Sequence, residues 1–84
     1  MSRHDLRKTV QQMLDHAEEA VSLCEGKIRE DLDNERLLNL ALVRLLEIIG
    51  EAARRVSKEF QVAHSEIPWR PIQAQRHVLA HDYG

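Results

Sequence analysis

The feature that most constrains the fold is a long stretch, from residue 35 to about residue 60, that contains no helix breaker except Gly50. Apolar residues fill most of its middle, including Leu42, Val43, Ile48 and Ile49. A helix that is apolar around most of its circumference must be covered on more than one side. The stretch therefore predicts a central helix over about 34–60, buried by neighbours from the same chain or from a second protomer.

A second amphipathic helix is predicted over about 3–25. Its apolar residues recur at steps of three and four, which draws one stripe along a helix. They are Leu6, Val10, Met13, Leu14, Ala17, Val21 and Cys24. Ser2, three residues before Asp5, is a candidate cap at the start, and Gly26 is a candidate stop. Residues 27–34 carry mixed charges and indicate a connection, with Asp33 or Asn34 as the next cap.

The two prolines place the start of a third helix. Pro68 and Pro71 cannot lie in a helix interior, because each lacks an N–H and restricts the residue before it. Pro71 does suit a first helical turn, which predicts a helix over about 70–80. With three glycines and two prolines in 84 residues, the chain has little turn chemistry for a sheet. We therefore expect one all-α domain over residues 1–84, a small antiparallel helical bundle.

Size and charge limit the partners. A chain of 84 residues buries only about 60% of its unfolded surface, so a homodimer that shares apolar area is expected. The net charge of −2 gives no overall basic character, and any RNA contact would have to be local. The single cysteine excludes an internal disulfide and fits a reducing compartment. With no signal peptide and no apolar run of about 18–20 residues, a cytoplasmic protein without a membrane partner is expected.

Residues suited to phosphodiester chemistry gather at the C-terminal end, in residues 76–84. Arg76 is a permanent cation that could hold a phosphate through two hydrogen bonds. His77 and His81 could exchange protons near neutral pH, because the reference pKa of histidine is about 6.5. RNA cleavage needs no outside nucleophile, since the neighbouring 2′-hydroxyl can attack once a base takes its proton.

The spacing alone leaves this interpretation open. Arg76 and His81 are five residues apart, so on an ideal helix they point roughly 140° away from each other. They converge only where the helix ends or bends before His81, or where two protomers each contribute a residue. The alternative is a polar helix end, with arginine and histidine near the C-terminal dipole.

Two blocks of sequence resemble the HepT-like branch of the HEPN (higher eukaryote and prokaryote nucleotide-binding) domains. Residues 44–52, Arg-Leu-Leu-Glu-Ile-Ile-Gly-Glu-Ala, are similar to the signature on that family's long central helix. Residues 66–70, Glu-Ile-Pro-Trp-Arg, precede a tail that resembles the family motif of Arg, four residues, His, any residue and Tyr. The resemblance implies a HEPN-like helical fold.

The resemblance also assigns roles. It implies a metal-independent endoribonuclease toxin of a toxin–antitoxin pair, with Arg76 and His81 as nuclease residues in a site shared by two protomers. His77 would support their orientation. Tyr83 matches the position at which an MntA-like nucleotidyltransferase antitoxin attaches AMP. RNA is the implied substrate, and no metal or other cofactor is expected.

The chain departs from the family pattern in two places. His77 stands where the family usually has Asn, and the sequence stops at Gly84, where relatives continue into a last helix. Both departures favour an alternative function, a catalytically silent helical module that dimerises through the central helix and binds a nucleotidyltransferase.

Other residues have simpler interpretations. We expect Cys24 to be a buried structural thiol, and Trp69 to be a packing anchor, with base stacking as the alternative. A basic cluster in the central stretch indicates a solvated helix face or contacts with RNA phosphate: Arg54, Arg55 and Lys58. Glu47 and Glu51 are expected either to be exposed or to pair with an arginine such as Arg44 or Arg76.

Overall fold

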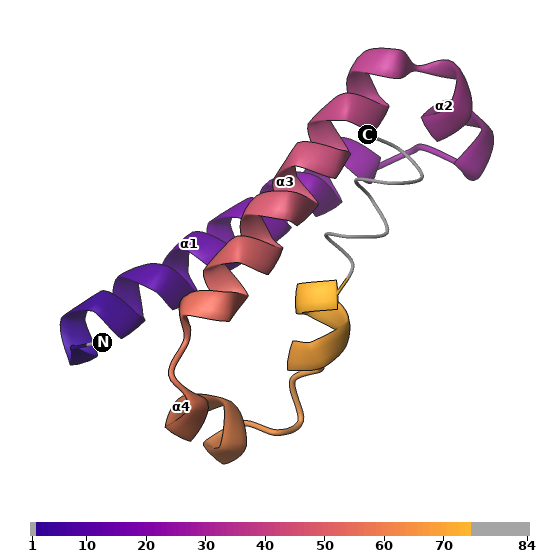
Figure 1. Cartoon of the computed structure of the whole chain (residues 1–84). Helices are drawn as coiled ribbons and strands as arrows, with labels where there is room; N and C mark the ends of the chain where they lie inside the picture. The colour runs from indigo at the N-terminus through magenta and orange to yellow at the C-terminus, as the bar shows by residue number, and fades with distance from the viewer. Residues whose placement is uncertain (1, 75–84) are drawn as a thin grey trace.

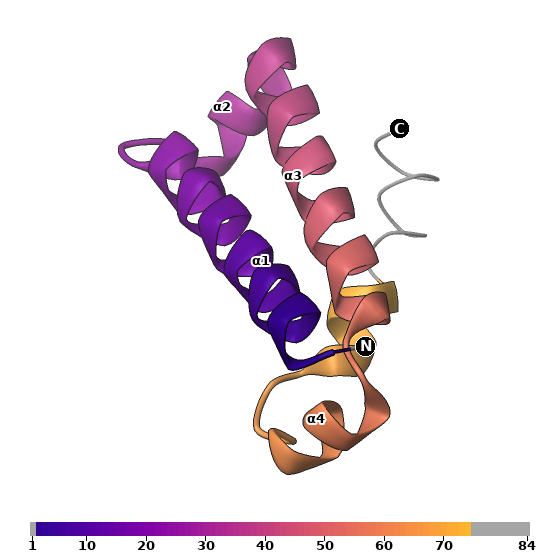
Figure 2. The ribbon, with the colours of Figure 1, turned by 90° about the vertical axis from the view of Figure 1, so that its left-hand side faces the viewer.

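In a computed structural model the chain folds as a helical bundle, described here over residues 2–74. Figure 1 shows two long helices, α1 (Arg3–Cys24) and α3 (Arg36–Arg55), that run antiparallel side by side. Two short helices, α2 (Arg29–Asn34) and α4 (Lys58–Ala63), lie at opposite ends of this pair, and residues 69–74 are also helical (Figure 2). Over residues 2–74 there is no strand, and no helix there is long and apolar enough to cross a membrane. The all-α prediction is confirmed.

Helix α1 begins and ends where the sequence predicts. The Ser2 hydroxyl accepts a hydrogen bond from the Asp5 backbone N–H at 3.1 Å and donates to the Asp5 carboxylate at 2.8 Å. After the helix, Gly26 has a φ of 73°, a left-handed conformation that glycine adopts without steric cost. The apolar stripe is wider than the surface α3 covers, because Leu14 and Val21 remain exposed.

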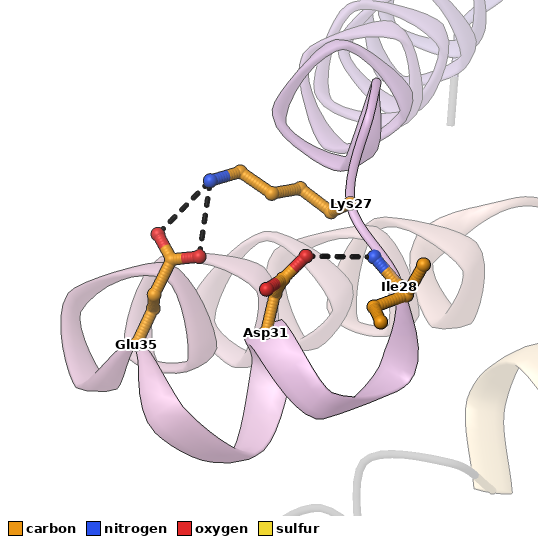
Figure 3. Close-up of polar contacts among 4 residues, drawn as sticks. All are labelled: Lys27, Ile28, Asp31 and Glu35. Atoms are coloured by element: carbon orange, nitrogen blue, oxygen red, sulfur yellow. Dashed lines mark hydrogen bonds and ion pairs between the residues drawn. The ribbon is translucent and has the colours of Figure 1, made fainter.

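The predicted connection between the first two helices contains a helix of its own, α2. The predicted cap at Asp33 or Asn34 is wrong, because Glu35 precedes α3 and its side chain makes no capping hydrogen bond. Instead, the Asp31 carboxylate accepts from the Ile28 backbone N–H at 2.9 Å and organises the start of α2 (Figure 3). Local capping by Asp31 thus turns a charged linker into a helical turn.

The central helix is shorter than the expected 34–60, since α3 ends at Arg55. Val56 leaves the helix with an extended backbone and is buried in the core. The Ser57 hydroxyl then accepts from the Phe60 backbone N–H at 3.3 Å and caps α4. A serine that satisfies free helical N–H groups favours a new helix start over continuation of the old helix.

Trp69, which is 8% exposed, belongs to the core at the α4 end of the bundle. Trp69 packs with Ala53 and Val56 of the central stretch, and a ring of partly buried side chains surrounds them: Leu6, Met13, Phe60, Ile67 and Ile72. The indole N–H donates to the His64 carbonyl oxygen at 3.0 Å. Trp69 is therefore the predicted packing anchor, and its ring is not available for base stacking.

We expect Trp69→Phe to lower the free energy of unfolding by about 1–3 kcal/mol, because the His64 carbonyl would lose its donor within a partly buried site. Urea unfolding followed by circular dichroism measures the change. Val62→Ala, at a residue of α4 that is 73% exposed, is the control and should change stability by no more than about 0.5 kcal/mol. Equal stability of both variants would contradict the role given to this hydrogen bond.

An ion pair joins the residues on either side of α2, Lys27 before it and Glu35 after it. The Lys27 ammonium lies 3.0 Å from each carboxylate oxygen of Glu35 (Figure 3). This hydrogen bonding, followed by the Coulombic attraction of the same carboxylate, raises the pKa of Lys27 above its ordinary value of 10.5. The resulting stabilisation is present below the ordinary pKa and is lost as pH rises through the raised, folded-state pKa.

Glu35→Gln should therefore return the pKa of Lys27 towards 10.5, because the largest causes of its shift disappear. A titration of the Lys27 side chain by heteronuclear NMR measures this directly. Glu30→Gln removes a carboxylate from α2 that does not contribute to the Lys27 shift, and it serves as the control, with no change expected. An unchanged Lys27 pKa in Glu35→Gln would show that the pair does not persist in solution.

Candidate functional site

The predicted site residues Arg76, His77, His81 and Tyr83 lie outside the described residues 2–74. Their roles therefore stay predictions. What the structure describes is the platform from which the chain enters this motif, together with the neighbouring surfaces. Those surfaces contain the other residues that could take part in the chemistry that the resemblance implies.

The platform consists of residues 67–74. Ile67, Trp69 and Ile72 belong to the core at the C-terminal end of α3. Backbone hydrogen bonds from the Trp69 N–H to the Ile67 carbonyl, at 2.8 Å, and from the Ile72 N–H to the Pro68 carbonyl, at 3.1 Å, shape its first turn. The segment that leads to Arg76 is thus held on the bundle by apolar contacts, while Arg70 and Pro71 are exposed.

The block that resembles the family signature lies on α3 and has two chemically different faces. Leu45, Ile49 and Ala52 are buried. Arg44 and Glu47 form an ion pair at 3.5 Å, with the arginine side chain mostly exposed. Of the arginines weighed as partners for Glu47, the structure thus brings Arg44 to it. This block serves the packing of α3 against α1.

Glu51 and the basic residues that follow it form a second polar group. The Glu51 carboxylate lies 3.7 Å from the Arg54 guanidinium. Arg55 donates to the side-chain oxygen of Gln12 at 3.0 Å, which ties the end of α3 to α1 without neutralising the arginine charge. Arg54, Arg55 and Lys58 are all exposed, as a solvated face requires.

The remaining candidates are structural or simply exposed. Cys24 is exposed at the end of α1, so the prediction of a buried thiol is wrong. The α1 stripe on which it lies extends beyond the surface covered by α3, and sequence periodicity alone could not show this. The His64 ring packs against Phe60 with centroids 4.3 Å apart, and its Nδ1 lies 3.4 Å from the Glu66 carboxylate. Residues 2–74 contain no group of three side chains able to hold a metal ion.

Two surface hollows lie at opposite ends of the bundle. One, of about 480 Å³, lies between the end of α1, α2 and the start of α3, and includes Ile28, Leu32 and Leu42. The other, of about 520 Å³, lies between α4 and residues 65–71. The second hollow is bordered by the platform that precedes Arg76, and sequence analysis did not identify it, because it depends on the tertiary packing of two separate segments.

Comparison with known proteins identifies the family. The family described as Ribonuclease HepT-like matches residues 13–84. A protein of Caldanaerobacter subterraneus subsp. tengcongensis named "Putative RNase TTE0752" is 38% identical over 77 residues, which are 92% of this chain and 69% of that protein. "Probable ribonuclease HepT" of Thermococcus cleftensis is 34% identical over 82 residues, covering 93% of this chain and 74% of its own.

A third relative, "Putative RNase MJ1380" of Methanocaldococcus jannaschii, is 28% identical over 83 residues, with 99% of this chain and 76% of that protein covered. No solved structure matches the fold significantly. The family match spans most of the chain, and two of these relatives exceed 30% identity over more than two thirds of their length. The chain belongs to the HepT-like ribonuclease family, which confirms the resemblance to HEPN domains.

Proposed function

We propose that this protein is a metal-independent endoribonuclease that acts as the toxin of a toxin–antitoxin pair. One observation carries the proposal: the family match runs through residue 84 and so includes the Arg76, His81 and Tyr83 motif. The names of the relatives, which refer to ribonucleases, support the same reaction class.

In the proposed reaction the residues divide the chemistry as follows. His81 acts as the base that takes the proton of the 2′-hydroxyl, or as the acid that protonates the leaving oxygen. The 2′-oxygen bonds to the adjacent phosphorus while the bond from phosphorus to the 5′-oxygen breaks, which leaves a 2′,3′-cyclic phosphate. Arg76 stabilises the charge that grows on the phosphoryl oxygens, and His77 supports the orientation of the site.

A homodimer would bring Arg76 and His81 together from two chains. Its support is apolar surface that the described residues leave uncovered, since Leu37 is 82% exposed and Leu40 is 42% exposed at the start of α3. On α1, Leu14 and Val21 are also exposed. A domain of this size gains stability when such side chains are buried against a second copy.

Regulation is proposed to act on Tyr83. A nucleotidyltransferase antitoxin of the MntA type would transfer AMP to the phenol oxygen, and pyrophosphate would leave from ATP. The added phosphate and nucleoside would lie within seven residues of Arg76 in the sequence and would compete with RNA for that cation.

Arg76→Ala and His81→Ala should each reduce RNA cleavage by about 10²-fold or more, as expected for the loss of a phosphate stabiliser or a proton-transfer group. The measurement is cleavage of a labelled RNA by purified protein in the presence of a chelator. His4→Ala, at an exposed histidine near the start of α1, is the matched control and should remain active. Full activity of either motif variant would refute the assignment.

A silent interaction module is the second candidate, favoured by His77 in place of the family's usual Asn. Expression of the protein alone distinguishes the two. A toxin slows growth and is relieved by His81→Ala or by a co-expressed antitoxin. A silent module leaves growth unchanged, shows no cleavage in vitro and still binds a nucleotidyltransferase.

The dimer is tested by placing a charge on the uncovered apolar surface. Leu37→Glu combined with Leu40→Glu should convert dimer to monomer in sedimentation experiments, while helicity is retained because both residues are exposed. Val62→Glu changes a residue of α4 that is 73% exposed and should leave the dimer intact. A monomeric wild-type protein, or a double variant that remains dimeric, would contradict a dimer formed through α3.

A further inference from the structure

The hollow between α4 and residues 65–71 is lined by both apolar and polar residues. Val62, Pro68 and Trp69 contribute apolar surface. Its polar lining residues are Lys58, Gln61, Ser65 and Arg70. Because Trp69 is almost fully buried and its N–H donates to the His64 carbonyl oxygen, its ring is not free to stack on a base.

Lys58 and Arg70 are the two cations that line this hollow, called the groove from here on, and both are exposed. Neither forms an ion pair with any residue between positions 2 and 74. The situation of Lys27 is different, because Glu35 holds its ammonium at 3.0 Å. Within residues 2–74, no carboxylate therefore competes with a ligand from solution for either cation.

Charge is distributed unevenly between the two ends of the bundle. The α2 end, residues 17–36, contains seven carboxylates and three cations. The α4 end, residues 2–12 and 51–74, contains seven cations and four carboxylates. Figure 2 shows α2 and α4 at opposite ends of the α1–α3 pair. The net charge of −2 thus conceals a basic end and an acidic end.

We propose that the groove between α4 and residues 65–71 binds the sugar–phosphate backbone of single-stranded RNA, with Lys58 and Arg70 each contacting a phosphate. The proposal rests on the ribonuclease function proposed above and names a substrate contact outside the Arg76–Tyr83 motif. The RNA would follow the α4 end and would avoid the α2 end, where residues 17–36 carry the excess of carboxylates.

The chemistry of the two side chains suits this task. The guanidinium of Arg70 presents a planar fork that matches two phosphate oxygens, and Lys58 supplies a compact charge on a flexible stem. Contacts of this kind position a strand and carry no base information. Arg70 precedes Arg76 by six residues, so the groove is close to the motif in the sequence.

The test is fluorescence anisotropy with a labelled single-stranded RNA and full-length protein carrying His81→Ala, so that the RNA is not cleaved. Lys58→Gln and Arg70→Gln should each weaken binding about fivefold at 0.1 M salt and should lower the slope of log K against log salt by about 0.7. The double variant should lose affinity and salt dependence by the sum of the two single effects. Lys58→Arg, which retains the charge, should bind like the parent.

The matched control is Arg36→Gln, which removes the same charge from an exposed residue at the acidic end. If Arg36→Gln weakens binding as much as the two groove variants, net charge alone governs binding; if none of the three weakens it, neither groove cation contacts RNA. Either result overturns the groove assignment and leaves the proposed nuclease function standing. If the parent protein binds no RNA and the wild type cleaves none, both proposals fail. Circular dichroism of each variant confirms that the exposed substitutions leave the helices intact.

Discussion

The burial of Trp69 against Ala53 and Val56 is the interaction on which the rest of the structure depends. Helices α1 and α3 pair along their length, whereas Trp69 is the buried residue through which the chain beyond α4 joins the core, with Ile67 and Ile72 packed around it. The indole N–H also donates to the His64 carbonyl oxygen, and this hydrogen bond links the end of α4 to the last described helical turn. A buried aromatic ring with a satisfied N–H gives this segment a single orientation, because rotation would expose the ring and break the bond.

This anchor links the packing of the core to the proposed chemistry. It sets the course of residues 67–74 and keeps Arg70 exposed beside Lys58. The same end of the bundle carries the excess of cations, while the α2 end carries the excess of carboxylates. Apolar packing therefore determines the course of the chain up to residue 74, and the charge distribution supports the RNA contact proposed at that end of the bundle.

The sequence was most informative where local rules act alone. Ser2, Asp5 and Gly26 mark the ends of α1 because capping and left-handed backbone depend on a few adjacent residues. The expected break before residue 69 follows from proline chemistry in the same way. The sequence failed at Val56 and Ser57, where core burial and a new cap interrupt an otherwise helical run. It also misjudged Cys24, because a stripe does not show how much of its width a neighbour covers.

The sequence by itself determined the helical class, the caps of α1, the family and the motif that includes Arg76 and His81. These depend on residue types and spacing. Only the tertiary structure decided that Trp69 is buried, that Leu37 and Leu40 stay uncovered, and that Lys58 and Arg70 border one groove. Such facts depend on contacts between residues that are separated in the chain. A net charge or an apolar periodicity does not show which of those residues packing brings together and which it keeps apart.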